Sequence, residues 1–182
     1  DGNFSHTAMV NRMNSDLAND FGNLAQRVLS MINKNCDGMV PTPGLLTVDD
    51  SALLVPAREL LVTMREHIDV QAIHHSLAAL WDVVGEANRY VDSQAPWALK
   101  KTDPERMATV LYVLAEVIRH LAILAQPVVP EAAGKMLDQL AIAEDQRSFA
   151  ALAEDGMLRP DTPLPKPQGV FPRYAGAEEA DA

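Results

Sequence analysis

Apolar residues recur at helical spacing along the chain as far as Leu140. Between Leu17 and Met31 they are separated by four, three, four and three positions, which is the period of a helix with one buried face. The same pattern returns in three later stretches, which are Leu53–Met64, Val70–Val91 and Met107–Leu124. We therefore predict successive amphipathic helices that pack on one another.

Capping residues and helix breakers predict where these helices begin and end. Asp69 is expected to cap the helix that follows it, and this helix should end near Ser93. Thr102 with Glu105 three positions later predicts a capping box at the start of the next helix. The other expected breaks lie at Asp37, Gly38, Pro41, Pro43, Gly44, Pro127 and Pro130.

The helical period decays after Ala143. We expect residues 1–143 to form an α-helical bundle and residues 144–174 to form a short helix and an extended, proline-rich strap. Phe171 and Tyr174 could anchor this strap on the bundle. Residues 175–182 are small or acidic, so we expect a disordered tail.

The composition agrees with an all-α fold. Of the 182 residues, 48% are hydrophobic and only 5% aromatic, and Leu, Ala, Val and Met dominate the apolar set. One cysteine, Cys36, allows no internal disulfide and favours a cytoplasmic location. Charged residues and Pro127 interrupt the most apolar stretch, Val110–Val129, so we expect no membrane contact. The chain begins without methionine, and we expect it to be an excised domain of a longer protein.

Motifs for catalysis, nucleotide binding and metal binding do not occur in the sequence. It has no glycine-rich phosphate loop, and no serine or cysteine in a recognisable nucleophile turn. The adjacent residues His74 and His75 would point in different directions on a helix, so we predict no metal site. Glu116 with Arg119, and likewise Glu86 with Arg89, are expected to be exposed pairs. We therefore predict no catalytic residue.

Two short motifs instead indicate recognition of unpaired bases. Asn23 and Arg27 lie four positions apart, so on a helix an amide and a guanidinium stand side by side at the border of the apolar stripe. Pro96 should hold Trp97 at a helix end, where the indole ring can stack on a base. Together these four side chains form a candidate base-binding site.

The net charge of −10 argues against general binding of nucleic acids. Phosphate neutralisation by Lys and Arg normally supplies most of the non-specific affinity, and this chain is acidic. A site that binds a few splayed bases needs only a local basic rim. Basic residues do cluster in sequence around the two motifs, at Arg27, Arg89, Lys100, Lys101 and Arg106.

The chain resembles the C-terminal anticodon-binding domains of methionyl-tRNA synthetases, which are class I aminoacyl-tRNA synthetases. The matching segments include Asp1–Ser5, Asn14–Asn19, Gly22–Leu24 with Arg27, Ala87–Val91, Gln94–Trp97 with Lys100, Leu111–Tyr112 with Glu116 and Arg119, and Phe171–Arg173. The resemblance implies an all-α helix bundle that packs against the catalytic domain of the same synthetase. It also implies a role in binding the CAU anticodon of methionine tRNA.

Carried over by this resemblance, the anticodon contacts fall on Asn23, Arg27, Pro96 and Trp97, with Trp97 stacked on the first anticodon base. Possible supporting residues are Asn88, Arg89 and Lys100, and Asn88 could instead brace the helix end through its amide. The His-Ile-Gly-His and Lys-Met-Ser-Lys-Ser signatures of the catalytic domain do not occur in this sequence. The parent's ATP and Mg therefore belong to that domain, and this chain alone should be inactive.

Simpler interpretations remain for each of these residues. Asn23 with Arg27 could be an ordinary solvated helix face, and Trp97 could be a packing aromatic, as we expect for Trp81. Lys100 and Lys101 could contact phosphate or merely balance acidic neighbours. The alternative function is a helical protein-interaction domain with no nucleic-acid role.

Overall fold

A computed structural model describes residues 5–153 and 156–174 and confirms the all-α prediction. The predicted tail, residues 175–182, lies outside the described residues. The helical elements along the chain are α1 (His6–Arg12), η1 (Met13–Gly22), α2 (Asn23–Asn35), α3 (Val48–Asp69), α4 (Ile73–Gln94), α5 (Pro96–Thr102), α6 (Pro104–Ala125), α7 (Pro130–Gln139), η2 (Glu144–Gln146) and η3 (Phe149–Leu152).

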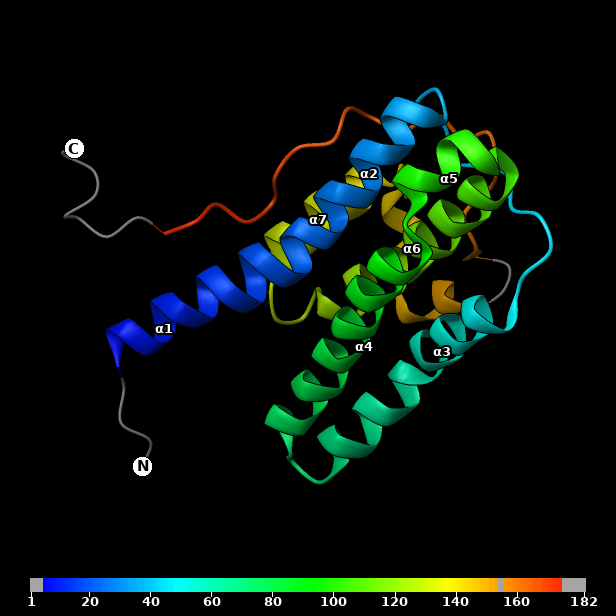
Figure 1. Cartoon of the computed structure of the whole chain (residues 1–182). Helices are drawn as coiled ribbons and strands as arrows, with labels where there is room; N and C mark the ends of the chain where they lie inside the picture. The colour runs from blue at the N-terminus through cyan, green and yellow to red at the C-terminus, as the bar shows by residue number, and fades with distance from the viewer. Residues whose placement is uncertain (1–4, 154–155, 175–182) are drawn as a thin grey trace, which may run out of the picture.

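Elements α1, η1 and α2 form one long continuous helix, which reaches beyond the rest of the bundle at its N-terminal end (Figure 1). The side chain of Ser5 caps its start by accepting a hydrogen bond from Ala8 N at 3.2 Å. The middle part, η1, is π-helical, but the backbone at both junctions keeps the right-handed helical conformation. The helix is thus longer than the predicted apolar stripe, which begins only at Leu17.

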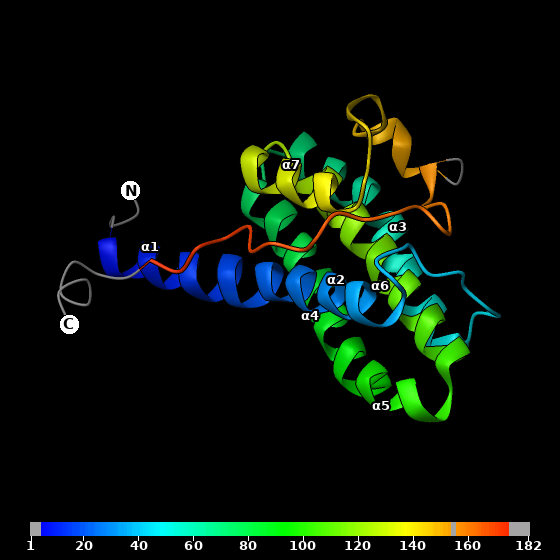
Figure 2. The same cartoon turned by 90° about the horizontal axis from the view of Figure 1, so that it is seen from above.

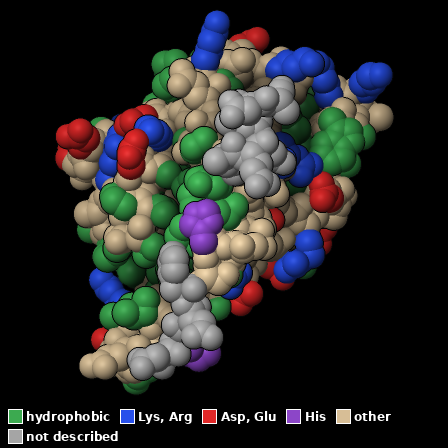
Figure 3. All heavy atoms as spheres, turned by 90° about the vertical axis from the view of Figure 1, so that its left-hand side faces the viewer, with side chains coloured by type: hydrophobic (Ala, Val, Ile, Leu, Met, Phe, Trp, Pro, Cys, Tyr) green, Lys and Arg blue, Asp and Glu red, His purple; other side chains and the backbone are tan. Residues whose placement is uncertain are grey.

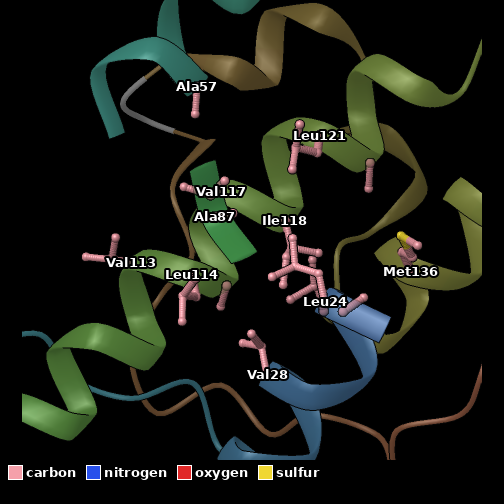
Figure 4. Packing of buried hydrophobic residues seen from close by; sticks show 14 of the residues in the cluster. Leu24, Val28, Ala57, Ala87, Val113, Leu114, Val117, Ile118, Leu121 and Met136 are labelled. Carbon is pink, nitrogen blue, oxygen red and sulfur yellow. The ribbon is translucent and has the colours of Figure 1, made fainter. Parts of the chain in front are cut away.

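Helix α6 runs through the centre of the bundle, where it contacts α2, α3, α4, α5 and α7 (Figure 2). Almost every side chain from Met107 to Ala125 is buried. Figure 4 shows Leu24 and Val28 of α2 near Leu114 and Ile118 of α6. This helix is long and apolar enough to cross a membrane, but 94% of its most apolar stretch is buried inside the protein. We conclude that α6 is the core helix of the bundle.

Two predicted helix caps are wrong. Asp69 is the last residue of α3 and not a cap of α4, whose N-cap, Ala72, makes no side-chain hydrogen bond. Thr102 ends α5, and the cap of α6 is its neighbour Asp103, which accepts a hydrogen bond from Arg106 N at 2.9 Å. The sequence pattern does not distinguish the short helix α5 from a loop. The predicted cap of α6 therefore lies one residue before the observed one.

The prediction that Glu116 and Arg119 form an exposed pair is also wrong. Both side chains are fully buried, and their shortest N–O distance is 2.5 Å. Both side chains also bind the segment that follows α7. Arg119 Nη1 donates to Ala151 O at 2.6 Å, and Glu116 Oε2 accepts from Leu158 N at 3.1 Å. An ion pair inside the core therefore attaches the C-terminal part of the chain to α6.

Between Leu158 and Tyr174 the chain runs without helices along the bundle and then beside the first long helix (Figure 2). Backbone hydrogen bonds join it to the α2–α3 loop, with Val40 N donating to Thr162 O at 2.9 Å. Further along, the ring of Phe171 lies 6.2 Å from that of Phe21 between centroids. The side-chain amide of Asn14 pairs with both backbone groups of Tyr174.

Candidate nucleic-acid interface

Asn23 and Arg27 lie one turn apart on α2, at the edge of its buried face. Leu24 and Val28, the residues that follow each of them, are fully buried, whereas Asn23 is exposed and Arg27 half-buried. The core thus fixes the direction of both polar side chains. This is the placement that the spacing predicted, and it presents an amide and a guanidinium on one surface.

Arg27 connects α2 to the two helices beside it. Its Nη2 donates to Asp92 Oδ1 on α4 at 2.9 Å. Its guanidinium carbon also lies 5.9 Å from the centre of the Trp97 ring on α5. These contacts bring together the two motifs that are distant in sequence, and they hold the guanidinium beside the exposed aromatic ring.

The backbone between α4 and α5 turns sharply and projects Trp97 from the bundle. Ala95 joins the two helices in the left-handed conformation, with φ of 45°, and Pro96 occupies the first turn of α5. Pro96 is buried, but 52% of Trp97 is exposed. The interpretation of Trp97 as a packing aromatic is therefore not supported. Trp81, by contrast, is half-buried, and its indole donates to Asp16 O.

The supporting residues have different surroundings. Asn88 is half-buried, and its amide donates to Val84 O at 3.2 Å and to Asp20 O at 3.4 Å, so it braces α4 against η1. Arg89 is exposed and pairs with Glu86 at 2.7 Å. Lys100 is exposed in the last turn of α5. Both cations can therefore reach solvent, Arg89 three positions before Asp92 on α4 and Lys100 three positions after Trp97 on α5.

Arg106 does not belong to the basic rim that the sequence suggested. Its guanidinium is turned inward and binds both carboxylate oxygens of Asp50, at 2.6 and 2.7 Å. Asp50 is fully buried, and it also accepts hydrogen bonds from Tyr90 Oη and from Thr47 N. Burial alone would raise the pKa of Asp50, but the hydrogen bonds from Arg106, Thr47 and Tyr90 outweigh it and lower this pKa to about 2.

Sequence reasoning missed this buried cluster, which lies behind the α4–α5 turn. Burial and the neighbouring Asp50 carboxylate raise the pKa of the Tyr90 phenol, which stays protonated and donates. The available signal was Thr47 three positions before Asp50, a capping box at the start of α3. Nothing in that pattern indicated that Arg106 would join the same carboxylate.

Two hollows flank the first long helix. One, of about 470 Å³, lies between Asn23 and Gln26 on α2 and the C-terminal residues Phe171 and Arg173. The other, of about 670 Å³, is lined mostly by apolar residues. These are Met9, Met13, Leu17, Leu77, Ala78, Trp81, Val128 and Val129. Figure 3 views the end of the molecule that carries α1 and shows apolar side chains on this surface.

Residues 5–153 and 156–174 contain no group of three or more His, Cys, Asp and Glu side chains placed to hold a metal ion. The α2–α4–α5 surface carries side chains of several chemical kinds. These are one exposed indole ring, a guanidinium, an amide and peripheral cations. Such groups stack on bases and donate hydrogen bonds to base edges and phosphates.

Comparison with known families agrees with this chemistry. The family model described as the anticodon binding domain of methionyl tRNA ligase matches residues 40–181. A methionine–tRNA ligase from Mesorhizobium japonicum is 56% identical over 182 residues, which is 100% of this chain and 35% of that protein. One from Rhizobium meliloti is 57% identical over 178 residues, covering 98% of this chain and 34% of the relative.

Solved structures give the same result for the fold. The apo form of Mycobacterium tuberculosis methionyl-tRNA synthetase superposes with a TM-score of 0.91 at 52% identity, covering 94% of this chain and 35% of that one. A structure of the same synthetase in complex with methionyl-adenylate has a TM-score of 0.90. The chain thus spans about a third of the length of the relatives that it matches.

Proposed function

Because this chain belongs to the family of anticodon-binding domains of methionyl-tRNA ligases, we propose that its α2–α4–α5 surface binds the anticodon loop of methionine tRNA. The observation that carries this assignment is the contact of Arg27 with Trp97, 5.9 Å from guanidinium carbon to ring centre. It joins a hydrogen-bond donor to an exposed stacking surface. Unpaired bases of RNA loops are commonly recognised by stacking on aromatic rings together with hydrogen bonds to their edges.

The four central residues have distinct roles in this proposal. Trp97 stacks on the first anticodon base, and stacking on an aromatic side chain contributes about 1–3 kcal/mol per base. Asn23 and Arg27 bind the polar edges of the CAU bases, because their side chains point from one face of α2. Pro96 fixes the start of α5 and so the direction of the indole.

The supporting residues act around this centre. Arg89 and Lys100, both exposed, contact the phosphates of the loop, while Asn88 keeps α4 against η1. A few local cations suffice because stacking and base contacts supply the specificity. The net charge of −10 then suppresses binding to other polyanions. Family membership favours this role over a protein-interaction domain without contact to nucleic acid.

The rest of the enzyme supplies the chemistry in this proposal. The chain covers 35% of its relative from Mesorhizobium japonicum, and the catalytic domain belongs to the remaining part. ATP with Mg is used there to attach methionine to tRNA, in the cytoplasm. The present chain holds the anticodon and thereby raises the effective concentration of the tRNA at that domain.

The test uses the fluorescence of Trp97. In a Trp81→Phe background, Trp97 is the single tryptophan of the chain. An RNA stem-loop with the CAU anticodon and one with an altered first base are titrated separately at low salt. Selective quenching by the CAU stem-loop is the expected result, because the first base stacks on this ring. Equal quenching by both RNAs contradicts the proposed specificity.

Absence of quenching by either RNA leads to the same titration on the complete ligase, where contacts elsewhere on the tRNA add avidity. Quenching restored in the complete ligase supports the anticodon site and assigns the missing affinity to the catalytic domain. If the complete ligase binds the tRNA without quenching Trp97, the assignment of this surface is wrong.

A further inference from the structure

The helix that carries Trp97 is too short to hold its own position. Helix α5 has seven residues, and isolated helices of this length are not stable in water. The indole itself contributes little packing because 52% of Trp97 is exposed. Ala95 at the start of α5 has φ of 45°, a backbone conformation that costs a non-glycine residue roughly 1 kcal/mol. Contacts outside the helix must therefore maintain this turn.

Both ends of α5 converge on Arg106. Before the helix, Gln94 Oε1 accepts a hydrogen bond from Arg106 Nη2 at 2.7 Å, and Gln94 Nε2 donates to Asp49 Oδ2 at 3.1 Å. After the helix, Asp103 Oδ1 accepts from Arg106 N at 2.9 Å, and Asp103 N donates to Leu99 O at 2.8 Å. One residue thus fixes the chain on either side of α5.

Arg106 is in turn held rigidly from α3. Its two terminal nitrogens bind the two oxygens of Asp50, a paired geometry that sets the plane of the guanidinium. The carboxylate is fully buried at the start of α3 and is held by Thr47 N at 2.7 Å and by Tyr90 Oη. The hydrogen bond to Gln94 therefore comes from a donor that has little freedom to move.

We propose that Arg106 is a positioning residue for anticodon binding, which acts through Gln94 and the two ends of α5 to set the orientation of Trp97. It does not contact the RNA. This inference rests on the proposed function for its consequence in binding, but the positioning itself can be measured without RNA. Lysine at this place keeps a cation beside Asp50, but it lacks the planar fork that also reaches Gln94.

The experiment compares Gln94→Ala and Arg106→Lys with a matched control, all in the full chain with Trp81→Phe. The control is Arg147→Lys, because the side chain of Arg147 is also 17% exposed and also pairs with a carboxylate, that of Asp138. Time-resolved fluorescence anisotropy without RNA measures the local motion of Trp97. Titration with the CAU stem-loop measures affinity, and circular dichroism with thermal unfolding measures the fold.

The expected result is a larger amplitude of Trp97 motion in Gln94→Ala and in Arg106→Lys, with a loss of stem-loop affinity of about fivefold for one hydrogen bond. Arg147→Lys should change neither quantity. Gln94→Ala leaves the Arg106–Asp50 pair intact, so it still tests the proposal if Arg106→Lys fails to fold.

Two outcomes separate the two proposals. If Trp97 motion and stem-loop affinity stay unchanged in both variants while the unsubstituted chain binds the stem-loop, the positioning role is wrong and the anticodon site stands. The second outcome is that Trp97 moves more in both variants, but the CAU stem-loop binds neither to the unsubstituted chain nor to the complete ligase. The positioning role is then upheld and the proposed function fails.

Discussion

The guanidinium carbon of Arg27 lies 5.9 Å from the centre of the Trp97 ring, although the two residues belong to different helices. The same guanidinium donates to Asp92 on α4 at 2.9 Å, which limits its rotation. A cation at this distance from an indole face is attracted by the ring and widens the flat surface on which a base can stack. Arg27 and Trp97 therefore form one continuous surface.

The first prediction follows from this contact. Arg27→Ala and Trp97→Ala should each weaken binding of the CAU stem-loop by about 1–3 kcal/mol, because each removes a base contact. The double variant should lose less than the sum of the two single losses, since either change disrupts the shared surface. A double-mutant cycle measured by isothermal titration calorimetry gives the coupling directly.

Arg65 provides the control for this cycle. Its guanidinium carbon lies 5.9 Å from the centre of the Phe149 ring, the same distance at another place on the protein. Arg65→Ala should leave stem-loop affinity unchanged. Additive losses at Arg27 and Trp97, or a comparable loss in Arg65→Ala, contradict a shared base-binding surface.

The second prediction concerns stability in acid. The pKa of Asp50 is lowered to about 2 in the fold, against about 3.9 in an unfolded chain. A lowered pKa contributes stability that is fully present above the unfolded value and is lost as pH falls through the folded value. Asp50 should therefore contribute about 2 kcal/mol to the free energy of unfolding at neutral pH, lost between about pH 4 and pH 2.

Urea denaturation of the unsubstituted chain and of Asp50→Asn across this pH range measures the contribution. Asparagine keeps the shape of the side chain but cannot ionise, so the stability difference between the two proteins should shrink as pH falls. A difference that stays constant from neutral pH to about pH 2 means that Asp50 ionisation does not stabilise the fold.

Local periodicity predicted most of the helices and the helical placement of the two candidate motifs, because both depend on neighbouring positions. Asn23 and Arg27 lie where a spacing of four places them, and Pro96 begins a helix as its ring geometry favours. The Asp50–Arg106 pair joins residues 56 positions apart, so no local pattern contained it. The predicted cap of α6 lies one residue too early because Thr102, the predicted cap, is the last residue of α5.

Burial of Glu116 and Arg119 could not be predicted for a related reason. A Glu–Arg pair three positions apart is typical of a solvated helix face. Here the chain that follows α7 covers that face of α6, and its backbone groups at Ala151 and Leu158 complete the hydrogen bonds. Only the tertiary position of the distant segment distinguishes this buried pair from the exposed pair of Glu86 and Arg89.

The third prediction compares two helical glycines. A Cβ atom on Gly85 would make an ordinary contact of 3.5 Å with the flexible Arg89 side chain, so Gly85→Ala should stabilise the fold by about 0.5–1 kcal/mol. A Cβ atom on Gly22 would lie 3.0 Å from Leu17 O and 3.1 Å from the ring of Phe171. Gly22→Ala should therefore destabilise the fold.

Thermal and urea unfolding of the two variants decide this comparison. The physical difference is that Gly22 is the last residue of the π-helical part of the long helix, where the backbone oxygen of Leu17 cannot move away as a side chain can. Stabilisation by Gly22→Ala equal to that by Gly85→Ala indicates that neither the Leu17 carbonyl nor Phe171 packs tightly against the glycine.

The last prediction concerns the buried pair on α6. Glu116→Gln removes the charge that compensates Arg119 in the core, and breaking a buried pair costs about 3–5 kcal/mol in the free energy of unfolding. Glu86→Gln breaks an exposed pair with the same spacing and should cost far less, because solvent screens that pair. Because Glu116 also accepts from Leu158 N, hydrogen exchange at that amide should accelerate in Glu116→Gln beyond the change in global stability. Equal stability losses in the two variants would mean that Arg119 finds other compensation in the core. An unchanged exchange rate of the Leu158 amide would mean that Tyr112 holds the segment without the carboxylate, because the Tyr112 hydroxyl donates to Leu158 O at 2.9 Å.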